Sequence, residues 1–235
     1  MDIGSAKITE EEMQGIPHEL IDIADPSEEW NVVRFQREAK AAVQRITAKG
    51  RLPVLVGGTG FYIQALLYDI DFTETREDTA YRSLLEEKAR TEGNESLYRM
   101  LLEKDPEAAA AIHPNNLKRV IRALEFTRET GEKISDHNEE QRKRLPAYDA
   151  VFFVLTMERE KLYRRIDLRV DQMMEAGLLE EVKRLQEQGF TSSDVSMQGL
   201  GYKQILQYLE GEGTLEDAVE QIKLQTKNPQ QHQAN

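Results

Sequence analysis

Apolar residues along this 235-residue chain follow two patterns, one with helical spacing and one in short unbroken runs. From Val32 to Ile46 they recur every three or four positions, which predicts an amphipathic helix that ends at Gly50. The run Val54-Leu55-Val56 is too short for a helix and leads into Gly57 to Gly60, so it predicts a strand, a glycine turn and a following helix. A helix that feeds such a strand is typical of a mostly parallel α/β sheet.

Two further runs predict strands of the same sheet. Ala150 to Leu155 is apolar, β-branched and aromatic, and Leu20 to Ile23 is a shorter candidate. After Leu155 we expect a helix that ends at Gly177. Its buried stripe is expected to consist of Leu162, Ile166, Val170 and Met173. A final helix is expected from Thr214, a favourable N-cap, to Leu224.

The region between these runs has a different character. From Asp78 to about Thr130 it is charged and helix-prone, with breaks at Thr91 to Asn94 and at His113 to Asn116, which predicts a helical insertion. Ser135 to Ala147 is polar and has no periodicity, so we expect a loop or a mobile arm. The predicted organisation is an α/β core from residues 1–70 and 148–225, a helical insertion from 71–147 and a disordered tail from 226–235.

Composition narrows the class of protein. The chain has no cysteine, which excludes disulfides and thiolate metal sites, and no apolar run approaches the ~20 residues that span a membrane. Its first residues do not resemble a signal peptide, so we expect a soluble protein of the cytoplasm. The net charge of −12 argues against a nucleic-acid partner, but local basic clusters allow the average to hide a basic face.

Four clusters carry candidate chemistry, each with an ordinary alternative. The glycine loop at the start of a helix suits a phosphate, because the first helical amides are unpaired, but a plain turn explains it equally well. Arg165 and Arg169 are either a clamp on phosphate or partners of Asp167 and Asp171 in surface ion pairs. The basic residues Lys118, Arg119 and Arg122 form either a phosphate-contacting surface or a solvated face. Ser196 to Lys203 is either a nucleic-acid contact or a capping loop.

Six ordered blocks of this sequence resemble the tRNA dimethylallyltransferase family. They cover nearly the whole chain, from Met1 to about Leu224, and are more specific together than any single glycine loop. The blocks are MDIGSAK (1–7), PHELIDIADP (17–26), LPVLVGGTGFYIQALL (52–67), DPEAAAAIHPNNLKRVIRALE (105–125), RIDLRVDQMMEAGL (165–178) and QGLGYKQ (198–204).

The resemblance implies an enzyme that transfers a dimethylallyl group from dimethylallyl diphosphate to the N6 amine of adenine 37, beside the anticodon of tRNA. It implies an α/β core similar to P-loop nucleotide-binding proteins, with a helical insertion that grips the anticodon stem-loop. It also implies Mg²⁺ as cofactor and a monomer without a membrane partner. The reaction requires stabilisation of the leaving diphosphate, alignment of the amine with the allylic carbon and removal of the adenine from its stack.

The family's functional residues match positions in several of these blocks. Arg169 matches the arginine that stabilises the diphosphate, and Gly57, Gly58 and Thr59 match the loop beside the reaction channel. The tRNA-contacting positions that the resemblance implies are Lys118, Arg119, Val120, Ile121 and Arg122, and then Gln198, Gly199, Leu200, Gly201, Tyr202 and Lys203.

The sequence departs from the family pattern at both ends. It starts at MDIG and contains no G-x-x-x-x-G-K-[ST] pattern, so we expect the phosphate cradle, the Mg²⁺-binding hydroxyl and the general base to be missing from an incomplete chain. Its last residues, TKNPQQHQAN, lack the family's basic and aromatic stretch. The chain alone is therefore expected to be nearly inactive and, with an exposed sheet edge, poorly soluble or dimeric. A prenyltransferase acting on free adenine nucleotides and a non-catalytic RNA-binding remnant are the alternatives.

Overall fold

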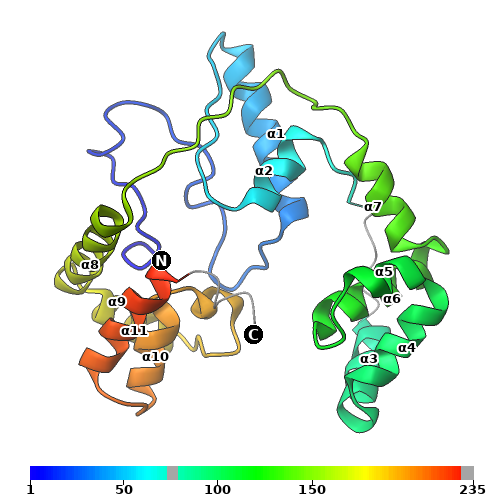
Figure 1. The fold of residues 1–235 in the computed structure, drawn as a ribbon. Helices are drawn as coiled ribbons and strands as arrows, with labels where there is room; N and C mark the ends of the chain where they lie inside the picture. Colours follow the sequence, from blue (N-terminus) through cyan, green and yellow to red (C-terminus); the bar gives the residue numbers. More distant parts are fainter. Residues whose placement is uncertain (73–78, 229–235) are drawn as a thin grey trace. The chain divides into compact units, whose positions relative to one another are not determined.

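The computed structural model describes residues 1–72 and 79–228, and the chain divides into two compact units. The first unit contains residues 1–52 and the chain from Val151 onward, and the second contains Pro53–Ala150. Figure 1 labels the helices along the chain. Each unit has its own buried apolar cluster, so each is described separately.

The second unit is built from packed helices. Its described elements are α2 (Gly60–Leu67), α3 (Thr79–Glu92), α4 (Asn94–Lys104), α5 (Pro106–Ala111), α6 (Leu117–Thr130) and α7 (Ile134–Arg142). Leu85, Leu97, Leu101 and Leu124 are fully buried where α3, α4 and α6 meet. Both breaks expected from the sequence are confirmed, because Gly93 separates α3 from α4 and the Asn116 side chain caps α6.

A third break, at Asp105, was not predicted. Asp105 ends α4 and caps α5, where its carboxylate accepts from the amide of Ala108 at 3.0 Å. The same carboxylate accepts from the amide of Ser135 at 3.0 Å and from its hydroxyl at 2.7 Å. Burial raises the pKa of Asp105, but these hydrogen bonds outweigh it and leave the pKa below its ordinary value. One buried carboxylate therefore joins three helices.

The loop or mobile arm expected from Ser135 to Ala147 is wrong for its first part, which forms α7. This helix has no apolar periodicity because it buries none of its residues. Half-buried Ile134 packs against the core cluster of the unit, and polar contacts also hold the helix. In its first turn, the amide of Ser135 donates to the Asp105 carboxylate. Further along the helix, His137 Nε2 lies 3.1 Å from the carbonyl oxygen of Asp71, and the Gln141 side chain accepts from the Asp71 amide at 2.9 Å.

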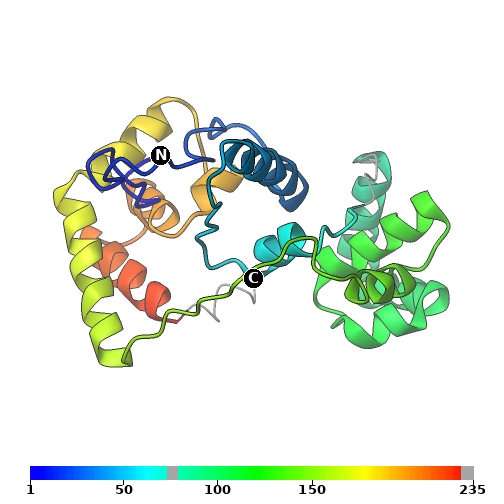
Figure 2. The same cartoon turned by 90° about the horizontal axis from the view of Figure 1, so that it is seen from above.

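The first unit is also helical. Its described elements are α1 (Val32–Ala48), α8 (Arg159–Glu175), α9 (Leu178–Glu187), the 3₁₀ turn η1 (Val195–Gln198), α10 (Tyr202–Leu209) and α11 (Leu215–Lys227). α10 packs against α9 and α11, and Figure 2 shows α8 running beside α11. Leu178, Val182, Met197 and Ile205 are fully buried in this cluster.

Two expectations about helices of this unit need correction. Of the predicted stripe on α8, only Val170 is fully buried and Leu162 is 43% exposed, because α9 and α11 cover the C-terminal half of the helix. The final helix does start after a Thr214 cap, as predicted, but it continues to Lys227. The first two residues of the expected disordered tail are therefore helical, and 229–235 lie outside the described residues.

The predicted strands do not form, and residues 1–72 and 79–228 contain no strand. Val54 to Val56 and Val151 to Leu155 are irregular and exposed, with Leu155 at 95%, while Leu20 and Asp22 have positive φ angles that a strand does not allow. A strand needs a neighbour for its hydrogen bonds, and no described segment supplies one. None of the described helices is long and apolar enough to cross a membrane.

Candidate functional site

Arg165 and Arg169 lie four residues apart on α8, so their side chains project from neighbouring turns of one face, and both are exposed. The nearby aspartates are engaged elsewhere. Asp171 lies 2.7 Å from Lys223 Nζ and Asp167 lies 2.5 Å from Lys227 Nζ, both on α11. The lysines of α11 thus take the carboxylates that were the alternative partners of the arginines.

The two guanidinium groups remain available to an anion. Arg165 has a contact of 4.0 Å with the sulfur of Met157, and Arg169 forms no hydrogen bond or ion pair with a residue that the structure describes. The charge of Arg169 is felt by Glu12, whose pKa is lowered mainly by hydrogen bonds from Thr9 and further by this guanidinium. An exposed arginine fork that is not hydrogen-bonded to a carboxylate is suited to binding phosphate oxygens.

The glycine loop belongs to the second unit, where α2 starts at Gly60 after Thr59. Gly57 and Gly58 are exposed, and a methyl group added at either position would meet nothing within 4 Å. Neither residue has a positive φ angle. The packing of the described chain therefore does not require glycine at these two positions, and the backbone of the loop is open to its surroundings.

Of the five α6 residues expected to contact tRNA, only the three basic ones are exposed. Lys118, Arg119 and Arg122 are exposed, but Val120 is fully buried and Ile121 is 4% exposed in the helical core. The side chains of Val120 and Ile121 pack inside the unit because they lie on the apolar face of the helix. Only the three cations of this segment can meet a phosphate backbone through their side chains.

The segment from Gln198 to Lys203 also contains both exposed and buried residues. Gln198 and Gly199 are exposed, and Leu200 and Lys203 are half-buried. Gly201 and Tyr202 are buried at the start of α10, and Tyr202 is only 2% exposed. The Gln198 side chain donates to the carbonyl of Ser192, which fixes the exposed end of the loop. Tyr202 therefore supports this loop from inside, which corrects its expected role as a direct contact.

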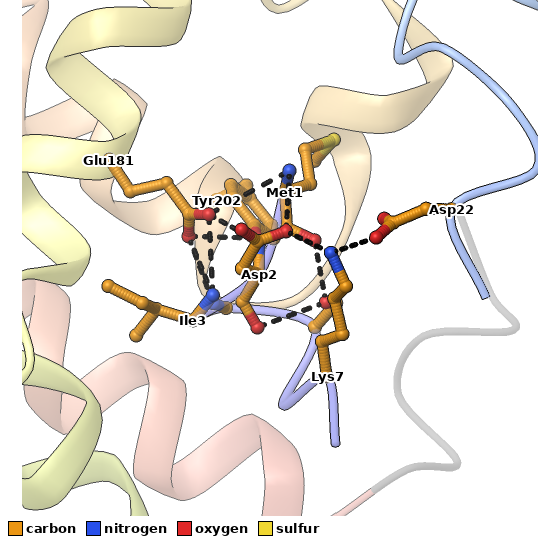
Figure 3. Close-up of polar contacts among 9 residues, drawn as sticks. Met1, Asp2, Ile3, Lys7, Asp22, Glu181 and Tyr202 are labelled. Carbon is orange, nitrogen blue, oxygen red and sulfur yellow. Dashed lines mark hydrogen bonds and ion pairs between the residues drawn. The ribbon is translucent and has the colours of Figure 1, made fainter. Parts of the chain in front are cut away.

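Sequence reasoning missed Glu181, the buried carboxylate labelled on the left of Figure 3. It accepts hydrogen bonds from the amides of Asp2, Ile3 and Gly4 and from the hydroxyl of Tyr202, the last at 2.9 Å. Burial raises the pKa of Glu181, but these four donors outweigh it and keep the pKa below its ordinary value. The available signal was its position on the apolar face of α9, between Leu178 and Leu185.

Tyr202 is fixed at both ends of its side chain. Burial, together with the negative charge of Glu181, strongly raises the pKa of its hydroxyl, so it stays a hydrogen-bond donor. Its ring lies against Gly4, where an added Cβ would come within 2.5 Å of a ring carbon. Lys7 adds ion pairs to Asp2 at 3.0 Å and to Asp22, but both aspartates are mostly exposed, so Glu181 is the main anchor.

Within residues 1–72 and 79–228, no three His, Cys, Asp or Glu side chains gather in a way that could hold a metal ion. The described residues therefore assign no side chain as a ligand of the Mg²⁺ that the resemblance implies.

Comparison with known proteins identifies the family of this chain. Residues 1–235 match the protein family described as IPP transferase. The tRNA dimethylallyltransferase of Lachnoclostridium phytofermentans is 58% identical over 228 residues, which are 97% of this chain and 73% of that protein. The corresponding protein of Acetivibrio thermocellus is 50% identical over 227 residues, 97% of this chain and 72% of that protein.

Solved structures lead to the same family. A full-length tRNA isopentenylpyrophosphate transferase from Bacillus halodurans is 45% identical, with a TM-score of 0.68 over 100% of this chain and 72% of that protein. A eukaryotic dimethylallyltransferase acting on tRNA is 34% identical, with a TM-score of 0.83 over 96% of this chain and 57% of that protein. With these relatives and a family match along its full length, the chain belongs to the IPP transferase family, the tRNA dimethylallyltransferases.

Proposed function

We propose that this chain serves tRNA prenylation, the transfer of a dimethylallyl group from dimethylallyl diphosphate to the N6 amine of adenine 37 beside the anticodon. In this substitution the amine nitrogen forms a bond to the allylic carbon while the bond from that carbon to the diphosphate oxygen breaks. The electron pair leaves with the diphosphate, and the nitrogen loses a proton. The protein must therefore stabilise negative charge that grows on the leaving group.

The observation that carries this proposal is the pair of arginines on α8. Their neighbouring aspartates are held by Lys223 and Lys227, so neither aspartate is paired with Arg169. We assign Arg169 to the leaving diphosphate, and Gly57, Gly58 and Thr59 to the backbone that borders the reacting group. When bound, Mg²⁺ would neutralise part of the charge of the diphosphate.

The surfaces for RNA are the exposed cations of α6 and the exposed end of the loop before α10. Lys118 and Arg119 lie in the first turn of α6, where cations oppose the helix dipole, so an anion beside them is favourable. We propose that Lys118, Arg119 and Arg122 contact the phosphates of the anticodon stem and that Gln198, Gly199 and Lys203 face the nucleotides around the target. Such contacts weaken as salt increases.

The apolar extended segments Val54 to Val56 and Val151 to Leu155 are strands of a P-loop-like sheet when partners are present, which is supported by their composition and by the likeness to solved transferases. The 235 residues contain no G-x-x-x-x-G-K-[ST] pattern, so prenyl transfer by this chain alone is slow.

Replacing Arg169 tests the proposal. Arg169→Ala is expected to weaken binding of inorganic diphosphate by about tenfold or more, because one charge-assisted bidentate contact is lost. Arg169→Lys should restore only part of the affinity, since an ammonium lacks the planar fork. The measurement is isothermal titration with diphosphate, followed by prenyl transfer to an unmodified anticodon stem-loop.

Arg164→Ala is the matched control, because Arg164 lies on the same helix, is 80% exposed and pairs with Glu160 at 3.6 Å. Its affinity for diphosphate should match that of the unsubstituted chain. Equal losses in Arg164→Ala and Arg169→Ala would show a general charge effect and remove the specific role of Arg169. Binding of adenine nucleotides in preference to the stem-loop would instead support a prenyltransferase of free nucleotides.

A further inference from the structure

Glu181 has no place in the chemistry described above, yet it is among the best satisfied carboxylates of the described chain. It is 6% exposed and receives four donors from two separate parts of the first unit. Three are consecutive amides at the start of the chain, and the fourth is the hydroxyl of Tyr202 at the start of α10. A buried carboxylate is costly unless it is hydrogen-bonded, so Glu181 and the two segments that supply its donors depend on one another.

The loop before α10 is held in part by these hydrogen bonds to Glu181. Gly201 has a φ angle of 95°, so the chain turns sharply just before Tyr202. The turn is held on one side by the Gly201 amide, which donates to the Gln204 side chain at 2.9 Å, and on the other by the Tyr202 hydroxyl on Glu181. Gln198 and Gly199 remain exposed at the far end of the same loop.

We infer that Glu181 is a positioning residue for RNA recognition: through Tyr202 and the amides of residues 2–4 it holds the Gln198 to Lys203 loop in the shape that receives the target nucleotides. This inference rests on the proposed tRNA function. Glu181 and Tyr202 themselves do not touch RNA, since both are buried. Their effect is to limit the conformations of a short loop, so that its exposed groups are arranged before binding.

The test compares Glu181→Gln with Glu180→Gln in the full chain. Glutamine keeps the shape of Glu181 but directs an NH₂ group at donors, so it breaks part of the network without leaving a cavity. Glu180 is the adjacent residue of α9, is 67% exposed and pairs with Lys183 at 2.8 Å, which makes it a matched control. Tyr202→Phe removes only the hydroxyl and provides a second variant if Glu181→Gln does not fold.

Three quantities are measured: hydrogen exchange of amides 2–4 and 199–203, affinity for an unmodified anticodon stem-loop, and affinity for inorganic diphosphate. We expect Glu181→Gln to speed exchange in both segments and to weaken RNA binding by about tenfold, with diphosphate affinity within about twofold. Tyr202→Phe should also speed exchange and weaken RNA binding. In the double variant, the loss of RNA-binding free energy should be smaller than the sum of the losses in the two single variants.

Unchanged exchange in the loop, or faster exchange with unchanged RNA affinity, would overturn the inference. Equal losses of RNA and diphosphate affinity would also overturn it, because they indicate general destabilisation. If the unsubstituted chain binds no stem-loop, the proposed function fails with the RNA part of the inference, while the exchange data still decide whether Glu181 holds the loop.

Discussion

The helices of the second unit are more polar than the two extended segments, yet it is the helices that bury their apolar residues. Leu97, Leu101 and Leu124 are completely buried, whereas Val56 is 87% and Leu155 is 95% exposed. A helix satisfies its backbone within itself and needs only a neighbouring apolar face, but a strand depends on another strand for its hydrogen bonds. Whether an apolar residue of this chain is buried therefore depends on a packing or pairing partner as well as on its hydrophobicity.

The largest effect that tests this comparison comes from two adjacent leucines of α4. Leu101→Ala should lower the free energy of unfolding by about 2–5 kcal/mol, because it leaves a cavity in a closed core. Leu102 is 47% exposed, so Leu102→Ala should change the free energy of unfolding by less than about 1 kcal/mol. Leu155→Ala should cost as little as Leu102→Ala. Urea unfolding measures all three, and a large cost for Leu155→Ala would mean that the extended segment is packed in solution.

Asp105→Ala should lower the free energy of unfolding by about 2–3 kcal/mol, because buried donors at the starts of α5 and α7 lose their acceptor. Asp136 lies in the exposed first turn of α7 and gives the control, since Asp136→Ala should cost less than about 1 kcal/mol. Chemical unfolding followed by circular dichroism measures both. Similar costs for the two variants would contradict the shared cap.

The same carboxylate makes the second unit sensitive to acid. Because the folded pKa of Asp105 is below its ordinary value, its contribution to stability is complete above about pH 4 and is lost as the pH falls through the folded pKa. Hydrogen exchange at α5 and α7 should therefore show less protection below pH 4. Asp105→Ala should reduce this dependence, and an unchanged acid response in that variant would assign it to other carboxylates.

A smaller effect is expected on stability from the lysines of α11. Lys223→Ala combined with Lys227→Ala should change the free energy of unfolding by less than about 1 kcal/mol, as for most surface pairs. Asp167 and Asp171 would then be free to pair with Arg165 and Arg169, so diphosphate affinity should fall. Titration with diphosphate decides this, and unchanged affinity would show that the lysines do not keep the arginines available.

The smallest effect on stability should come from the exposed apolar run. Phe153→Lys combined with Leu155→Lys should change the free energy of unfolding by less than about 0.5 kcal/mol but reduce self-association, because charges discourage pairing of unsatisfied strand edges. Sedimentation velocity over a range of concentrations measures this. Val195→Lys, at an isolated exposed position, is the control and should leave association unchanged.

These differences also explain what was predictable from sequence. The helices, the break at His113 to Asn116 and the cap at Thr214 depend on residues close together in the sequence, so their pattern is local and readable. The predicted strands failed because pairing is not local, and α7 was missed because its support comes from Asp105, 30 residues earlier. At the site, residue types indicated Arg169 and the basic cluster, but only the fold shows that Val120 and Tyr202 are buried.

The shared cap at Asp105 has a practical consequence for engineering the second unit. An inserted residue between α4 and α5 would move one carboxylate away from two helix starts at once, so this junction cannot be lengthened without loosening both. Gly93, between α3 and α4, is exposed and has nothing within 4 Å of an added Cβ. A peptide tag or the new termini of a circular permutant therefore belong at Gly93, where no distant helix depends on the length of the chain.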